Sequence, residues 1–145
     1  MDFHEQLFVE TDDSCAICSL RGIGILTEHH IDGDPSHTTY DNLIVLCHNC
    51  HHAHHNDKGL TTRQIKDRKR HLIEKTLTTY GLSAMKKAER NKFGVVAMPF
   101  LLHHLVGLGY MTEEEQTMGY GEQDDATVRF AITERGKSLL SEWFH

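Results

Sequence analysis

The chain has 145 residues, of which 39% are hydrophobic, and a formal net charge of -6 at pH 7. This length suits one ordinary domain or two small ones, and the hydrophobic content excludes an intrinsically disordered chain. No apolar run approaches the roughly 20 residues that span a bilayer, and the first ten residues lack the basic start and apolar stretch of a signal peptide. We therefore expect a folded cytoplasmic protein that does not cross a membrane.

Residues 1–14 form a short amphipathic lead-in, and two close pairs of cysteines follow it along the chain. The four cysteines are Cys15, Cys18, Cys47 and Cys50. In a reducing compartment, cysteines in such pairs are more often metal ligands than disulfide partners. Two pairs can deliver four thiolates tetrahedrally to one ion, so the sequence predicts a structural zinc site that ties the lead-in to a later segment. Four unrelated buried cysteines are the alternative.

Two β segments lie between the cysteine pairs. Residues 23–31 combine β-forming residues with two histidines, residues 42–46 are a short β-branched run, and the turn-rich loop 32–41 joins them. This order predicts a β-hairpin with a long connection. Because His29 and His30 are adjacent on the first strand, their side chains point to opposite faces. We therefore expect one of them to bind metal and the other to act as a base.

A short helix follows the second cysteine pair and ends near Gly59, where glycine can adopt the left-handed cap. His51 and His55 are four residues apart and therefore share one face of this helix, a spacing that suits chelation of one metal ion. His54 competes with His55 for this role. The dense histidines of this segment also fit a solvated, metal-binding tract without catalysis.

Residues 15–70 resemble the HNH endonuclease family, also called ββα-metal nucleases. The resemblance rests on the segments Glu28-His29-His30-Ile31, Asp41-Asn42-Leu43-Ile44 and Leu46-Cys47-His48-Asn49-Cys50-His51. It implies that His29, His51 and His55 hold a catalytic divalent ion and that His30 is the general base that activates water. It also places Asn42 in the catalytic motif, where its amide bridges the loop and holds His30 in orientation. An ordinary turn asparagine is the alternative for this position.

The charge is unevenly distributed, and its basic part follows the histidines. Residues 1–57 carry one basic residue against ten acidic ones, residues 58–92 carry eleven against three, and residues 93–145 carry three against eight. Apolar residues at helical spacing predict a second helix in the basic segment, with Gly81 as its stop. Cations beside the histidines suit contacts to a phosphate backbone, while a solvated helix face is the alternative. The candidate phosphate contacts are Arg63, Lys66, Lys69 and Arg70.

The last third of the chain has its own pattern of elements. It predicts helices at 82–92 and 95–108, then a Gly-Tyr turn and an acidic loop, then a strand at 127–132 and a final helix at 134–144. Thr133 is the expected cap of the final helix. The order of these elements loosely resembles a reduced winged-helix domain.

The expected fold is therefore α+β, in two domains. Residues 1–80 are expected to form the HNH nuclease domain, a ββα-metal module that is stapled by the four-cysteine zinc site and followed by a long basic helix. Residues 81–145 are expected to form a small winged-helix-like α/β domain.

The family resemblance implies an endonuclease that hydrolyses phosphodiester bonds of double-stranded DNA. Its cofactors would be a structural Zn²⁺ and a catalytic divalent ion, which is Mg²⁺, Mn²⁺, Ni²⁺ or Zn²⁺. Such hydrolysis requires a nucleophilic water, a base and a cation that neutralises developing charge. One alternative is a catalytically silent, zinc-stabilised DNA-binding regulator. Another is a protein-interaction module whose acidic C-terminal domain forms a homodimer or recruits a protein partner.

Overall fold

The computed structural model describes residues 2–118 and 127–145 and shows a mixed α+β protein, as the sequence predicted. The chain divides into two compact units, Met1–Thr76 and Leu77–His145. The sequence placed the boundary a few residues later, after residue 80. No helix in the described part of the chain has the length and apolarity needed to cross a bilayer.

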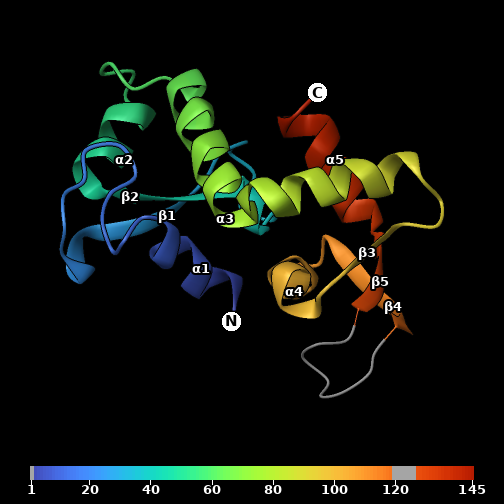
Figure 1. Ribbon diagram of the computed structural model, residues 1–145. Coiled ribbons are helices and arrows are strands. Elements are labelled where there is room, and N and C mark those ends of the chain that lie inside the picture. The colour runs from blue at the N-terminus through green and yellow to red at the C-terminus, as the bar shows by residue number, and fades with distance from the viewer. Residues whose placement is uncertain (1, 119–126) are drawn as a thin grey trace. The chain divides into compact units, whose positions relative to one another are not determined.

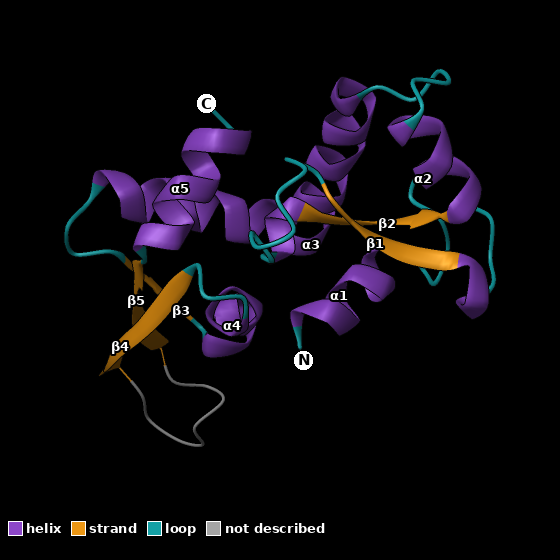
Figure 2. Cartoon of the chain, turned by 180° about the vertical axis from the view of Figure 1, so that it is seen from behind, coloured by secondary structure: helices purple, strands orange, loops and turns teal. Residues whose placement is uncertain are grey.

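The N-terminal unit is built around a two-stranded antiparallel hairpin. Helix α1 (Phe3–Glu10) precedes strand β1 (Leu26–His30), and strand β2 (Leu43–Cys47) leads directly into helix α2 (His48–His55). His29 of β1 pairs with Ile44 of β2, and His30 pairs with Leu43. Figures 1 and 2 show α1 and α2 on opposite sides of the hairpin. The long-loop hairpin expected from the sequence is therefore present, with β1 shorter than expected because residues 23–25 form a 3₁₀ turn.

Strand β2 forms the centre of this unit's core. Every side chain from Leu43 to Cys47 is at most 1% exposed. A strand that is covered on both faces needs apolar residues at successive positions rather than at alternate ones. This explains why the sequence from Leu43 to Leu46 is a continuous apolar run.

A fully buried ion pair joins α1 to the long helix α3 (Thr62–Arg90). Lys69 is 0% exposed, and its Nζ lies 2.7 Å from Glu10 Oε1 and 4.0 Å from the centre of the Tyr40 ring. The other carboxylate oxygen of Glu10 accepts hydrogen bonds from the Tyr40 hydroxyl and from Thr76 Oγ1. The prediction that Lys69 contacts phosphate is therefore wrong. Lys69 follows buried Ile65 by four residues, so it projects from the buried face of α3.

Helix α3 consists of two helical segments that meet at Thr78, whose φ of 67° and ψ of 159° lie outside the helical range. The sequence placed the stop at Gly81 instead, and this prediction is wrong. Thr78 Oγ1 accepts a hydrogen bond from the Gly81 amide at 3.1 Å, so Thr78 caps the second segment. A side chain at Gly81 would lie 3.2 Å from His104 Nε2, so the glycine permits close packing within the C-terminal unit.

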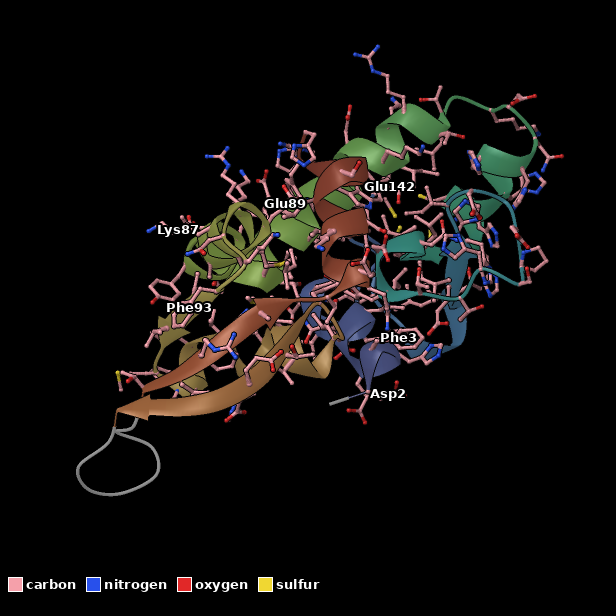
Figure 3. The ribbon with its side chains drawn as sticks, turned by 90° about the vertical axis from the view of Figure 1, so that its right-hand side faces the viewer. Asp2, Phe3, Lys87, Glu89, Phe93 and Glu142 are labelled. Carbon is pink, nitrogen blue, oxygen red and sulfur yellow. The ribbon has the colours of Figure 1, made fainter. Side chains whose placement is uncertain are left out.

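The C-terminal unit contains a three-stranded antiparallel sheet in the order β3-β5-β4, drawn in orange in Figure 2. Its elements after α3 are β3 (Val95–Ala97), α4 (Pro99–Gly107), β4 (Met111–Met118), β5 (Thr127–Ile132) and α5 (Glu134–Trp143). Its core includes the buried side chains of Met85, Leu105, Tyr110, Phe130 and Leu140. An apolar side chain is exposed just before β3, where Phe93 is 54% exposed and is labelled in Figure 3.

Two predicted elements of this unit need correction. The helix expected at 95–108 begins only at Pro99, because a residue before proline disfavours helical geometry and proline is well suited to the first helical turn. The preceding Val95 and Val96 extend into a strand instead. Part of the expected acidic loop forms β4, and residues 119–126 lie outside the described residues. Strand β5 and helix α5 lie where they were expected, and Thr133 Oγ1 accepts a hydrogen bond from Gly136 N at 3.0 Å.

Candidate metal centres and catalytic site

The four cysteines converge in the N-terminal unit, as their spacing predicted. Their sulfur atoms all lie within 4.8 Å of one another, and the Sγ atoms of Cys18 and Cys47 are 3.6 Å apart. A tetrahedral zinc ion with Zn–S bonds of about 2.3 Å holds its sulfurs about 3.8 Å apart. The cluster therefore has the donor set and the approximate dimensions of a structural zinc site.

Local hydrogen bonds position the first cysteine pair. The amides of Cys15 and Ser19 close a tight turn by donating to the carbonyls of Leu20 and Cys15, each at 2.9 Å. Ala16 lies in this turn and attaches it to the rest of the unit. Its amide donates to Val45 O of strand β2 at 2.9 Å, and its carbonyl accepts from Arg68 Nε of helix α3 at 2.8 Å.

The second cysteine pair lies where β2 becomes α2. Cys47 is both the last residue of the strand and the N-cap of the helix, and its Sγ accepts a hydrogen bond from Cys50 N at 3.4 Å. This geometry turns both sulfurs of the pair toward the same point. Burial raises the pKa of the Cys50 thiol, and the neighbouring thiols raise it further. Because several sulfurs share this small volume, a cation is needed to stabilise them together as thiolates.

A second cluster lies between strand β1 and helix α2. Ligand nitrogens of His29, His51 and His55 all lie within 4.8 Å of one another. The ring centroid of His29 lies 5.0 Å from that of His51 and 5.3 Å from that of His55. The spacing of His51 and His55 on α2 thus brings both side chains close to His29 of β1.

One nitrogen of this cluster lacks a partner in the described part of the chain. His29 is 4% exposed, and its buried Nε2 makes no hydrogen bond there. A buried polar atom without a partner is costly, and most such atoms in native proteins have one. A metal ion held with His51 and His55 would satisfy this lone pair, so these three residues fit a divalent cation.

The electrostatics of the cluster also favour neutral imidazoles. Burial lowers the pKa of His29 to about 4, and repulsion from His51, His54 and His55 adds to this effect. Burial likewise lowers the pKa of His51. At neutral pH these rings therefore keep the lone pair with which imidazole binds a metal.

The alternative ligand, His54, lies beside the cluster but outside the set of three. Its ring centroid is 4.9 Å from that of His29, and its Nδ1 lies 3.0 Å from Leu60 O. A carbonyl oxygen only accepts, so Nδ1 of His54 must donate to it. This bond leaves the Nε2 lone pair of His54 available, but the nitrogens that lie within 4.8 Å of one another are those of His29, His51 and His55.

His30 and Asn42 lie at the two ends of the loop that joins β1 to β2. His30 Nε2 is 3.1 Å from Thr38 Oγ1. The Asn42 side chain accepts from Asp32 N at 3.2 Å and donates to His37 O at 2.8 Å. The amide of Asn42 therefore spans the loop beside His30, as expected of a residue that holds the loop in shape.

The remaining predicted phosphate contacts lie on the first half of α3. Arg63, Lys66 and Arg70 are exposed, and Arg70 NH1 lies 3.0 Å from the carboxylate of Glu74. Without Lys69, the exposed cations of this helix form a smaller set than the sequence indicated.

Sequence reasoning missed several residues that support these clusters. Thr27 lies two residues before His29 and therefore on the same face of β1. The alternation of side chains along a strand could have predicted its position. Thr38 lies in an irregular loop, and Arg68 was counted only as part of the basic segment. No periodic signal identifies either of these two.

Comparison with known proteins yields no relative. No family model matches the chain, and neither the curated proteins nor the solved structures include a significant match. The functional interpretation of the two clusters therefore rests on their residues and geometry.

Proposed function

We propose that this chain is a metal-dependent endonuclease of the HNH type that hydrolyses phosphodiester bonds in double-stranded DNA. The observation that carries the proposal is the buried Nε2 of His29, which has no hydrogen-bond partner among the described residues and lies beside His51 and His55. The next residue on the same strand is His30, the proposed general base. A purely structural zinc protein has no need for this second set of imidazoles.

The proposed metal centre holds a divalent ion through His29, His51 and His55. Such an ion stabilises the charge that develops on a phosphodiester during hydrolysis. Three imidazole donors suit Zn²⁺ or Ni²⁺ better than Mg²⁺ or Mn²⁺, which prefer oxygen ligands. We therefore expect Zn²⁺ or Ni²⁺ to support cleavage better than Mg²⁺.

The other residues of the proposed site move a proton, hold the loop in place and bind the phosphate backbone. His30 takes the proton of the attacking water, whose oxygen bonds to phosphorus. The bond from phosphorus to the 3′ oxygen breaks, and this oxygen takes a proton from solvent, so the fragments carry 3′-hydroxyl and 5′-phosphate ends. Asn42 holds the loop next to His30 through its bonds to Asp32 N and His37 O. Arg63, Lys66 and Arg70 contact phosphates without distinguishing bases.

For the C-terminal unit we propose a reduced winged-helix-like fold that contacts a protein partner or a second copy of the chain. Helix α4 contains no lysine or arginine, so it is poorly suited to a DNA groove. Strand β4 carries the acidic residues Glu113 and Glu114, and Phe100 is 71% exposed. This surface suits a protein better than a polyanion.

A plasmid cleavage assay tests the proposed activity. Supercoiled plasmid is incubated with the zinc-loaded protein and Mg²⁺, Mn²⁺, Ni²⁺ or added Zn²⁺, with and without chelator. Wild type should cleave with at least one transition-metal ion. His30→Ala should lose about 10²- to 10⁴-fold in rate, the usual contribution of a general base.

The matched control is His52→Ala, because His52 lies on the same helix but is exposed and bonded to Asn56. His51→Ala should abolish cleavage, whereas His52→Ala should cleave like wild type. If wild type and His30→Ala are equally inactive with every ion while DNA is still retarded on a gel, the silent DNA-binding regulator replaces the nuclease.

A further inference from the structure

Two threonine hydroxyls contact two histidines of the proposed site, at opposite nitrogens of the ring. Thr27 Oγ1 lies 3.1 Å from Nδ1 of His51. Thr38 Oγ1 lies 3.1 Å from Nε2 of His30. A neutral imidazole carries one N–H proton, on either Nδ1 or Nε2. A hydroxyl that bonds to one of these nitrogens therefore favours one tautomer.

The direction of the Thr27 contact follows from the second bond of its hydroxyl. Thr27 Oγ1 also lies 3.1 Å from Leu46 O, and a carbonyl oxygen only accepts. The single hydroxyl proton therefore goes to Leu46 O, and Thr27 Oγ1 accepts from the ring. His51 thus carries its proton on Nδ1, and its Nε2 lone pair is free to bind a cation.

The same reasoning gives the opposite result for His30. Thr38 Oγ1 lies 3.4 Å from Pro35 O, to which it donates its proton. The hydroxyl oxygen then accepts from the ring, so His30 carries its proton on Nε2. Its Nδ1 is left with a lone pair that can take a proton from water.

We propose that Thr27 and Thr38 are positioning residues that hold His51 and His30 in opposite tautomers, so that one imidazole is preset as a metal ligand and the other as a base. The inference rests on the proposed function for the roles of the two histidines. The tautomers themselves do not depend on it, because they follow from the hydrogen bonds alone.

Nitrogen NMR of the histidine rings tests the tautomers without any measurement of activity. Spectra of the zinc-loaded protein are recorded at slightly alkaline pH, and the two signals are assigned with His51→Ala and His30→Ala. We expect protonated Nδ1 in His51 and protonated Nε2 in His30. Thr27→Val and Thr38→Val should each remove this preference in their own histidine only. The opposite tautomer in either ring, or no change in the valine variants, overturns the inference.

Metal affinity and cleavage rate separate the two roles. Calorimetric titration of zinc-loaded protein with Ni²⁺ should show about 10- to 100-fold weaker binding for Thr27→Val, the usual effect of removing a partner of a metal-binding histidine. Thr38→Val should leave the Ni²⁺ affinity unchanged and lower the rate at saturating Ni²⁺ by roughly 10-fold or more. Thr27→Ser and Thr38→Ser keep the hydroxyl. Thr27→Ser should therefore bind Ni²⁺ like wild type, and Thr38→Ser should cleave like wild type.

The zinc content of each variant shows that the N-terminal unit is still folded. If wild type never cleaves DNA, the proposed function fails, while the NMR and Ni²⁺ results still decide the tautomers. If wild type cleaves and Thr38→Val cleaves equally fast, the inference fails and the nuclease stands.

Discussion

The two compact units are stabilised by different means. The N-terminal unit has a two-stranded hairpin, four clustered cysteines and a fully buried ion pair between Lys69 and Glu10. The C-terminal unit has no cysteine and packs a three-stranded sheet against helices through side chains such as Tyr110 and Phe130. A two-stranded hairpin is marginal by itself, and small domains often need a metal or another cross-link.

This difference indicates where stability and chemistry are coupled. In the N-terminal unit, the second cysteine pair belongs to the helix that carries His51 and His55, since Cys47 is the N-cap of α2 and Cys50 lies in its first turn. A change at the cysteine cluster is therefore expected to disturb the histidine cluster. The C-terminal unit depends on apolar burial, which does not respond to chelators.

Zinc removal should give the largest difference between the two units. Structural zinc contributes an apparent free energy of about 10–16 kcal/mol, which exceeds the whole stability of most small domains. Cys47→Ser should therefore lose the roughly one zinc per chain and unfold the N-terminal unit. Metal analysis measures the zinc, and amide NMR dispersion measures the fold of residues 2–76.

The C-terminal unit provides an internal control for this experiment, because Trp143 of α5 is the only tryptophan in the chain. Its fluorescence should remain native in Cys47→Ser, and zinc should restore the chelated wild type. Loss of the native Trp143 signal together with zinc would show that the two units unfold as one.

Breaking the buried ion pair should have the next largest effect, again on the N-terminal unit. Lys69→Met leaves the Glu10 carboxylate buried without its cation and should cost about 3–5 kcal/mol of unfolding free energy. Adding Glu10→Gln should recover part of this loss, because glutamine removes the charge and still accepts from Tyr40 and Thr76. Urea unfolding followed by circular dichroism measures each value.

Lys66→Met is the matched control, since Lys66 is exposed on the same helix. It should change the unfolding free energy by less than about 0.5 kcal/mol. Equal effects of Lys66→Met and Lys69→Met would contradict the buried position of Lys69.

The smallest effect is expected in the C-terminal unit, at the cap of α5. Thr133 Oγ1 accepts from Gly136 N at 3.0 Å and donates to Gly109 O at 2.7 Å. Thr133→Ala should cost about 1–2 kcal/mol, whereas Thr133→Ser should be close to wild type. Trp143 fluorescence during urea unfolding measures this change. An altered zinc content in Thr133→Ala would argue against the separation of the two units.

Local patterns predicted those parts of the fold that depend on neighbouring residues. The hairpin, the helix after Cys47, strand β5 and the cap at Thr133 were all found near their expected positions. The errors at Lys69 and Gly81 arose where long-range packing overrode a local signal. Gly81 was taken as a helix stop, although its lack of a side chain serves close packing beside His104.

The order of residue types along the chain is enough to indicate two candidate sets of metal ligands, because paired thiols and histidines at i and i+4 carry their geometry with them. It does not indicate which side chains from distant segments meet. Lys69 pairs with Glu10 across 59 positions, and Thr38 reaches His30 through an irregular loop. Such contacts depend on how helices and loops pack in three dimensions, and no periodicity of the sequence encodes them.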